Sequence, residues 1–211
     1  MNAVLTIAAK APIPGHVKTR LASRIGDEAA AELYRAFLTD LMARFPEASW
    51  YVDPLAEWSR SFPATRASGQ PAGDWTERQR AFFRDAATRG EDRAVLVASD
   101  SPQLRRSLVD EAFALLERHE VVLGPTTDGG YSLIGMRGFH DVLAGVAMST
   151  SSVLCELEEA ARTLGVRLAL LEPIYDVDEV EDFERLRLDA ATRDDLPATR
   201  AALESILEVS R

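Results

Sequence analysis

The chain has little of three residue types that often carry chemistry: one cysteine, three histidines and two lysines among 211 residues. The single cysteine, Cys155, cannot form an internal disulfide or a cysteine-rich zinc site, which is typical of a reducing compartment. The histidines His16, His119 and His140 do not form a ligand cluster, and no Ser/His/Asp arrangement is apparent. We therefore assign no nucleophile and expect neither a disulfide framework nor a histidine metal site.

Long hydrophobic runs are also missing. No run approaches the roughly 18 apolar residues that a membrane helix needs. The apolar opening, residues 3–9, has no basic residue before it and is too short for a signal peptide. We therefore expect a cytoplasmic protein without a membrane partner. A content of 46% hydrophobic and 27% charged residues excludes disorder, collagen and coiled coil, and the length predicts one domain over residues 1–211.

The net charge of −10 argues against nucleic-acid binding, but the basic residues are unevenly placed. Four of them, and no acidic residue, precede Asp27, and both lysines of the chain are among the four. Compact ammonium groups suit phosphate, so this segment indicates a local anion site. The alternative is that the lysines are solvated loop residues. The four are Lys10, Lys18, Arg20 and Arg24.

The apolar pattern alternates between strands and helices. Residues 3–9 and 94–98 are continuous apolar runs, as in parallel strands covered on both faces. Further strands are expected at 49–53, 121–123, 131–134 and 167–171. Apolar residues at helical spacing predict a first helix through Ile25, Ala29, Leu33, Phe37 and Leu41. A second helix is expected to begin at Asp74, with Glu77 completing a capping box, a third follows Asp100, and a fourth ends at Gly165. Two short helices are expected near 179–190 and 197–209.

This alternation predicts an α/β three-layer sandwich with a mixed, mostly parallel sheet, on which the C-terminal helices of 179–211 pack. Ligands in such folds bind at the carboxyl ends of the strands. The functional residues should therefore lie in 10–20, 99–102 and 172–178.

The loop after the first strand resembles a P-loop only superficially, because Pro12 and Val17 occupy positions that a P-loop needs as glycine. What remains is a proline-stiffened loop that carries Lys10, Lys18 and Arg20 beyond a buried strand. Three cations at this place would neutralise a di- or triphosphate as charge develops on a leaving group.

Three aspartates are the candidate metal ligands. Asp100 ends the most apolar strand, where a carboxylate is well placed for Mg²⁺, and Asp176 and Asp178 alternate in an extended segment so that both can face one ion. Each signal has a structural alternative. Asp100 could cap a helix that starts at Pro102, and Asp178 with Glu181 could form a capping box.

Two further segments carry polar groups that could meet a ligand. The sequence Asp128-Gly129-Gly130-Tyr131 is typical of a hairpin turn. Its glycines would also let backbone amides approach a ligand, with Tyr131 as a wall. The hydroxyls of residues 149–152 either cap a helix or help to hold a phosphate. From these segments we take Asp128, Gly129, Gly130, Tyr131, Ser149 and Thr150 as the acceptor-binding candidates.

In order, AKAPIPGHVKTRLA, GDWTERQ, ASDSP, GPTTDGGYSLIG, the Ser-Thr pair and YDVD closely resemble a bacterial family of small glycosyltransferase-like proteins. Members are labelled arsenosugar-biosynthesis or radical-SAM-associated glycosyltransferases, or left as a domain of unknown function. The family is a branch of the nucleotide-diphospho-sugar transferase superfamily, similar to phospholactate and molybdenum-cofactor guanylyltransferases. The match runs from Ala3 to about Asp182.

The resemblance implies a GT-A-type Rossmann-like domain with a bound divalent metal, Mg²⁺ or Mn²⁺. Asp100 and Asp178 match the metal-binding positions, and Lys18 and Arg20 match phosphate-contacting ones. Two segments depart from the pattern. The GDLGER stretch of relatives, which contains Gly73, reads GDWTER here and so loses a glycine, and Met148 replaces an aromatic residue before the Ser-Thr pair.

The leading hypothesis is a Mg²⁺-dependent transferase with a nucleotide-sugar donor and a small-molecule acceptor. One alternative is a nucleotidyltransferase that moves a nucleoside monophosphate to a small phosphorylated acceptor, and another is a non-catalytic nucleotide-binding module. The catalytic candidates are Lys18, Arg20 and Asp100; the phosphate-binding candidates are Lys10, Lys18, Arg20 and Gly73; and the metal ligands are Asp100 and Asp178, assisted by Asp176.

Overall fold

The computed structural model describes residues 2–148 and 150–209. Over these residues the chain forms a seven-stranded sheet in the order β3-β2-β1-β4-β6-β5-β7. All neighbouring pairs are parallel except those that involve β6, which runs antiparallel to β4 and β5. This mostly parallel mixed sheet confirms the predicted fold class. The strands are β1 (Ala3–Lys10), β2 (Ser49–Asp53), β3 (Ala67–Gly69), β4 (Arg93–Ala98), β5 (Val121–Pro125), β6 (Tyr131–Arg137) and β7 (Leu168–Leu170).

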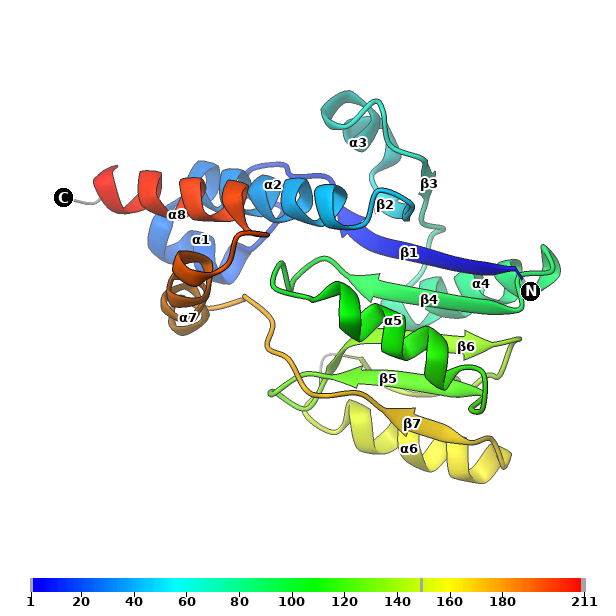
Figure 1. The fold of residues 1–211 in the computed structure, drawn as a ribbon. Helices are drawn as coiled ribbons and strands as arrows, with labels where there is room; N and C mark the ends of the chain where they lie inside the picture. Colours follow the sequence, from blue (N-terminus) through cyan, green and yellow to red (C-terminus); the bar gives the residue numbers. More distant parts are fainter. Residues whose placement is uncertain (1, 149, 210–211) are drawn as a thin grey trace.

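Helices cover both faces of the sheet (Figure 1). Side chains alternate along β1, so that Leu5 and Ile7 pack with residues of α2 and α5, while Ala8 packs with residues of α4 and α6 on the other face. Both clusters are buried, which explains why the strands are continuously apolar. The helices are α1 (Thr19–Ile25), α2 (Asp27–Arg44), α3 (Leu55–Ser61), α4 (Trp75–Thr88), α5 (Arg106–Leu115), α6 (Val153–Leu164), α7 (Val180–Thr192) and α8 (Pro197–Val209).

The helix expected from Ile25 to Leu41 is in fact two helices. Gly26, at φ 90°, separates α1 from α2, so Ile25 belongs to α1. The capping box of Asp74 and Glu77 at the start of α4 is confirmed, and so is the end of α6 at a left-handed Gly165.

The C-terminal helix is anchored to the long helix α2. Asp40 on α2 is 2% exposed, and its carboxylate accepts hydrogen bonds from the amides of Ala198 (3.0 Å) and Thr199 (2.8 Å) in the first turn of α8. α8 therefore packs along α2, as Figure 1 shows. In the part of the chain that the structure describes, no helix is long and apolar enough to cross a membrane.

The sheet topology fixes where a ligand can enter. β1 lies between β2 and β4, so the chain leaves β1 toward one side of the sheet and later returns on the other side. The carboxyl ends of β1 and β4 thus border the crevice at which open α/β sheets bind ligands.

Candidate functional site

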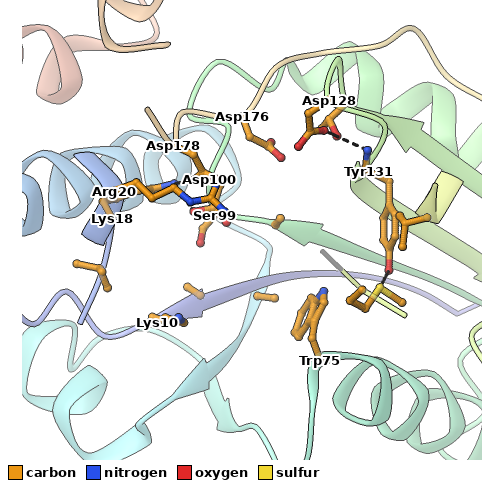
Figure 2. A pocket seen from close by; sticks show the side chains of 18 of the residues that line it. Lys10, Lys18, Arg20, Trp75, Ser99, Asp100, Asp128, Tyr131, Asp176 and Asp178 are labelled. Carbon is orange, nitrogen blue, oxygen red and sulfur yellow. Dashed lines mark hydrogen bonds and ion pairs between the residues drawn. The ribbon is translucent and has the colours of Figure 1, made fainter. Parts of the chain in front are cut away.

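A cavity of about 690 Å³ opens at the carboxyl ends of β1 and β4 and beside the turn between β5 and β6 (Figure 2). Segments that are distant in the sequence meet there, as predicted from the strand ends. Gly129 is not among the residues that line the cavity, and Ser149 lies outside the described residues. The predicted residues that do line it are Lys10, Lys18, Arg20, Gly73, Asp100, Asp128, Gly130, Tyr131, Thr150, Asp176 and Asp178.

Lys18 joins two of the predicted metal ligands. Its ammonium nitrogen Nζ donates to Asp100 Oδ1 and, at 3.0 Å, to Asp178 Oδ1. The Lys18 side chain is 3% exposed, whereas the two carboxylates are 43% and 47% exposed. Lys18 precedes α1 in a left-handed conformation (φ 48°, ψ 41°), which a bulky residue rarely adopts. Its ammonium therefore faces carboxylates, where the sequence had led us to expect a phosphate contact.

Tyr34 of α2 borders this lysine. Its ring centroid lies 5.8 Å from Lys18 Nζ, and its hydroxyl shares a 2.6 Å hydrogen bond with Ser99 and accepts one from the Lys10 amide. Burial raises the pKa of Tyr34 to about 12, so the phenol is neutral. Burial alone would lower the pKa of Lys18, but the carboxylates of Asp100 and Asp178 outweigh it and hold that pKa well above its usual range.

Neither Asp100 nor Asp178 caps a helix. α5 begins only at Arg106, after the N-cap residue Arg105. The capping box of α7 is formed one residue later than expected, by Glu179 and Asp182. The structural alternatives considered for the two aspartates are therefore wrong, and both carboxylates are directed to Lys18 and the cavity.

The third aspartate is set apart from this pair. Asp176 Oδ1 accepts a hydrogen bond from the Ser101 hydroxyl, and in Figure 2 Asp176 lies on the side of the pair nearer Asp128. Burial raises the pKa of Asp176 to about 6; the Asp100 and Asp178 carboxylates add to the rise, and the Ser101 hydrogen bond opposes it. Within residues 2–148 and 150–209 no three Asp, Glu, His or Cys side chains are grouped closely enough to hold a metal ion. The geometry thus does not support the predicted grouping of all three aspartates.

The donor set nevertheless fits Mg²⁺ in one respect. Mg²⁺ is usually held by one or two carboxylates together with substrate phosphates and water. Asp100 and Asp178 meet at one ammonium and are both about half exposed to the cavity, so they supply two such carboxylates. They match a metal that takes its other ligands from a nucleotide.

The other two predicted cations remain accessible. Lys10 is exposed, and its side chain makes no hydrogen bond or ion pair within the described part of the chain. The Arg20 side chain is 71% exposed, and its only ion pair there is a 3.6 Å contact with Glu179. Both can therefore contact an anion in the cavity.

One wall of the cavity is the segment between β3 and α4. Arg78 braces it: Nε donates to the Gly73 carbonyl (3.0 Å), and Nη1 donates to Asp53 Oδ2 and Gln70 Oε1 (both 2.9 Å). Trp75 lies in the segment that these Arg78 hydrogen bonds hold, and it faces the cavity in Figure 2. Trp75, which stands at the leucine position of the GDLGER pattern, therefore contributes an indole ring to this wall of the cavity.

The opposite wall is the hairpin turn between β5 and β6. Asp128 Oδ1 accepts from the Thr126 hydroxyl (2.6 Å) and the Gly130 amide (3.1 Å), which shapes the turn. Gly129 has φ 91°, and a Cβ there would lie 2.3 Å from the Ser151 carbonyl oxygen, so this glycine serves packing. The hairpin prediction is confirmed.

Tyr131 forms a wall, as expected, but its hydroxyl is already engaged. It donates to Gln79 Oε1 (2.9 Å) and lies 3.5 Å from the sulfur of Met148. Burial holds the pKa of Tyr131 well above its usual range. Thr150 lines the cavity before α6, whose N-cap residue, Ser152, makes no side-chain capping bond.

Sequence reasoning missed Tyr34, Arg78 and Gln79. Tyr34 and Gln79 are polar-tipped side chains buried on faces that pack against the sheet, at 3% and 0% exposure. A polar tip within an apolar helical stripe was the available signal. Arg78 left no signal, because its partners are set by the tertiary fold.

Residues 45–150 match the family described as "Uncharacterized protein conserved in bacteria (DUF2064)". The chain belongs to the DUF2064 family. A curated relative, 3-phospho-D-glycerate guanylyltransferase of Phenylobacterium zucineum (strain HLK1), is 30% identical to this DUF2064 protein over 188 residues, covering 78% of this chain and 81% of the relative.

Solved structures share the DUF2064 fold seen here. A crystal structure from Desulfovibrio desulfuricans G20, to which nucleotide-diphospho-sugar transferase activity has been attributed, superimposes with a TM-score of 0.90 at 28% identity over 99% of this chain and 98% of that one. CMP:2-keto-3-deoxy-manno-octonic acid synthetase in complex with CTP matches with a TM-score of 0.53 at 15% identity, over 90% and 99% of the chains, which shows the fold alone.

These relatives confirm that this DUF2064 protein is an enzyme of the transferase class, with a fold of the nucleotidyltransferase and nucleotide-diphospho-sugar transferase type. They do not bear on the association with arsenosugar biosynthesis or radical-SAM enzymes, which stays a prediction.

Proposed function

We propose that the protein is a nucleotidyltransferase that moves a nucleoside monophosphate from a nucleoside triphosphate to a small phosphorylated acceptor. The observation that carries the proposal is the convergence of the Asp100–Asp178 pair with the exposed cations Lys10 and Arg20 at one end of the sheet. A curated relative that is a guanylyltransferase supports this chemistry over the glycosyl transfer favoured by the sequence alone.

In the proposed reaction, an acceptor oxygen attacks the α-phosphorus, and the bond from that phosphorus to the bridging oxygen breaks. Pyrophosphate leaves, and the acceptor proton goes to solvent. Lys10 and Arg20 would hold the triphosphate and offset the charge that develops on pyrophosphate. The acceptor would lie toward the opposite wall, near Asp128, Tyr131 and Thr150.

Mg²⁺ is part of the proposal. Asp100 and Asp178 would hold it against the phosphates, where it would neutralise their charge. Asp176 lies beside the pair, toward Asp128 of the acceptor wall, and is not needed as a ligand in this proposal.

Pyrophosphate release decides the chemistry. The purified protein is supplied with Mg²⁺, each nucleoside triphosphate and a panel of small phosphorylated acids, and pyrophosphate is measured. Release that depends on both acceptor and Mg²⁺ supports nucleotidyl transfer. Release of nucleoside diphosphate from a sugar nucleotide, without pyrophosphate, would favour the second candidate, glycosyl transfer, which the similarity to the Desulfovibrio structure supports. Nucleotide binding with no turnover of either kind would identify a non-catalytic module.

A further inference from the structure

We infer that Lys18 is a built-in counter-cation that keeps the Asp100–Asp178 pair from binding a free divalent metal, so that the metal enters the site together with the nucleotide phosphates. The inference rests on the proposed function, because it presumes a metal–nucleotide complex as the substrate. It assigns Lys18 a positioning role through the two aspartates, in place of a contact with phosphate.

The charges of Lys18, Asp100 and Asp178 are the first observation that supports the inference. Two carboxylates alone would present a charge of −2 to a divalent ion. The ammonium of Lys18 contacts both of them and halves this charge, and it also repels the ion directly. Free metal is therefore attracted much less than the carboxylates alone would suggest.

Lys18 is held in this position. Its side chain is 3% exposed, and Tyr34, whose own hydroxyl is fixed by Ser99, borders the ammonium. Its backbone adopts the left-handed conformation at the start of α1. To leave the aspartates, the ammonium would have to give up two charged partners within a buried environment, which is costly.

The donor count is the second, independent observation. Mg²⁺ demands close to six oxygen ligands, and among the residues described no three acidic, histidine or cysteine side chains are grouped closely enough to hold a metal ion. Asp176, a further carboxylate that lines the cavity, accepts a hydrogen bond from the Ser101 hydroxyl. The protein alone thus offers an incomplete site, and the oxygens of a polyphosphate would complete it.

The accessible cations favour the same order of events. Lys10 and Arg20 are exposed at the cavity and attract a polyphosphate, whose negative charge then outweighs the ammonium at the aspartate pair. A nucleotide that carries its own divalent ion supplies both the missing oxygen ligands and the negative charge that offsets the Lys18 ammonium.

Titration with Mn²⁺ tests the inference without requiring turnover. Free Mn²⁺ is followed by electron paramagnetic resonance, with and without a non-hydrolysable nucleoside triphosphate analogue. We expect the unmodified protein to bind Mn²⁺ weakly by itself. The protein and the analogue together should bind Mn²⁺ at least about tenfold more tightly than the protein alone or the analogue alone. We expect Lys18→Met to bind free Mn²⁺ about tenfold or more tightly than the unmodified protein, as removal of a unit charge at contact distance implies.

Two variants serve as controls. Lys10→Met makes the same change in charge within the same cavity, but Figure 2 shows Lys10 apart from the aspartate pair, so the affinity of this variant for free Mn²⁺ should change by less than about twofold. Lys18→Arg keeps the charge and should keep the weak affinity of the unmodified protein. Circular dichroism and thermal melting establish that each variant is folded.

Three results would overturn the inference: free Mn²⁺ bound by the unmodified protein as tightly as in the presence of the analogue, no gain in Lys18→Met, or an equal gain in Lys10→Met. If Lys18→Met does not fold, the comparison with and without analogue still decides. These outcomes are separate from pyrophosphate release, because tight binding of free metal would leave nucleotidyl transfer standing, and failure of the transfer assay would leave the metal affinities unchanged.

Discussion

Lys18 and Asp178 lie 160 positions apart in the chain, yet the lysine nitrogen and an oxygen of the aspartate are separated by 3.0 Å. The contact joins the loop that precedes α1 to the segment that precedes α7. Because the lysine is buried and the carboxylate is half exposed, the pair has one side in the protein interior and one side in the cavity. The stability of the fold and the chemistry of the cavity are therefore linked at this contact.

The first prediction follows from that link. Asp100→Asn should lower nucleotidyl transfer at least about 100-fold, because a carboxylate beside the phosphates is lost. It should also lower the free energy of unfolding by about 1–3 kcal/mol, because buried Lys18 loses one of its two charged partners. Pyrophosphate release and urea denaturation measure the two effects. Glu172→Gln is the control and should alter both far less, because it changes an exposed carboxylate on the segment before Asp176 that, among the described residues, neither bonds to Lys18 nor caps a helix.

Trp75 should report nucleotide binding by its fluorescence. The other two tryptophans, Trp50 and Trp58, are 2% and 0% exposed and pack against each other with ring centroids 4.9 Å apart, whereas Trp75 faces the cavity. A nucleoside triphosphate should quench the emission, and the quenching should vanish in Trp75→Phe. Inorganic triphosphate separates an effect of the base from one of the phosphates. Undiminished quenching in Trp75→Phe would show that the nucleotide does not reach this wall.

The cluster around Glu120 should make stability depend on pH. Hydrogen bonds from the Arg167 side chain (2.6 and 3.0 Å), assisted by the Arg167 amide and by Arg137, hold the pKa of Glu120 well below its usual range. A carboxyl whose pKa is lower in the folded state stabilises the fold above its unfolded pKa, and this contribution is lost as the pH falls below about 4.5.

Glu120→Gln should therefore cost about 1 kcal/mol at pH 7, a value that allows for solvent screening of the surface arginines. The difference from the unmodified protein should shrink as the pH falls below about 4.5. Urea denaturation of both proteins between pH 3 and pH 7 checks this, at roughly half-unit steps. A difference that stays constant over this range would contradict the assignment.

Gly129→Ala should be destabilising by about 2–4 kcal/mol, since the residue has φ 91° and an added Cβ would collide with the Ser151 carbonyl. Gly138→Ala is the matched comparison: Gly138 also has a positive φ, of 74°, but an added Cβ there meets nothing within 4 Å. It should cost only about 1–2 kcal/mol. Equal losses in thermal or urea denaturation would show that Ser151 does not restrict Gly129.

The location of the cavity could be predicted from the sequence because the ends of buried strands leave a clear local pattern. The apolar runs that became β1 and β4 end next to Lys10 and Asp100, and the carboxyl ends of neighbouring parallel strands must lie side by side. The strand β3 was missed, since its three residues, Ala-Ser-Gly, have low β propensity and pair only at the edge of the sheet.

The arrangement within the cavity could not be predicted in the same way. Whether Lys18 faces a phosphate or a carboxylate depends on its left-handed backbone and on Tyr34, and neither is visible in the local pattern. The capping box of α7 differed from the expected one by a single residue, from Asp178 to Glu179, and this shift leaves Asp178 directed to Lys18.

The anchoring of α8 by Asp40 has a consequence for any shortened form of the protein. Asp40 is on the same helix as Tyr34, less than two turns further along. Truncation ahead of Pro197 would remove the two amides that hold the Asp40 carboxylate and would expose to solvent the face of α2 on which α8 packs. The C-terminal helix therefore stabilises the helix that carries Tyr34 beside Lys18, and its removal would disturb a cavity that none of residues 197–209 lines.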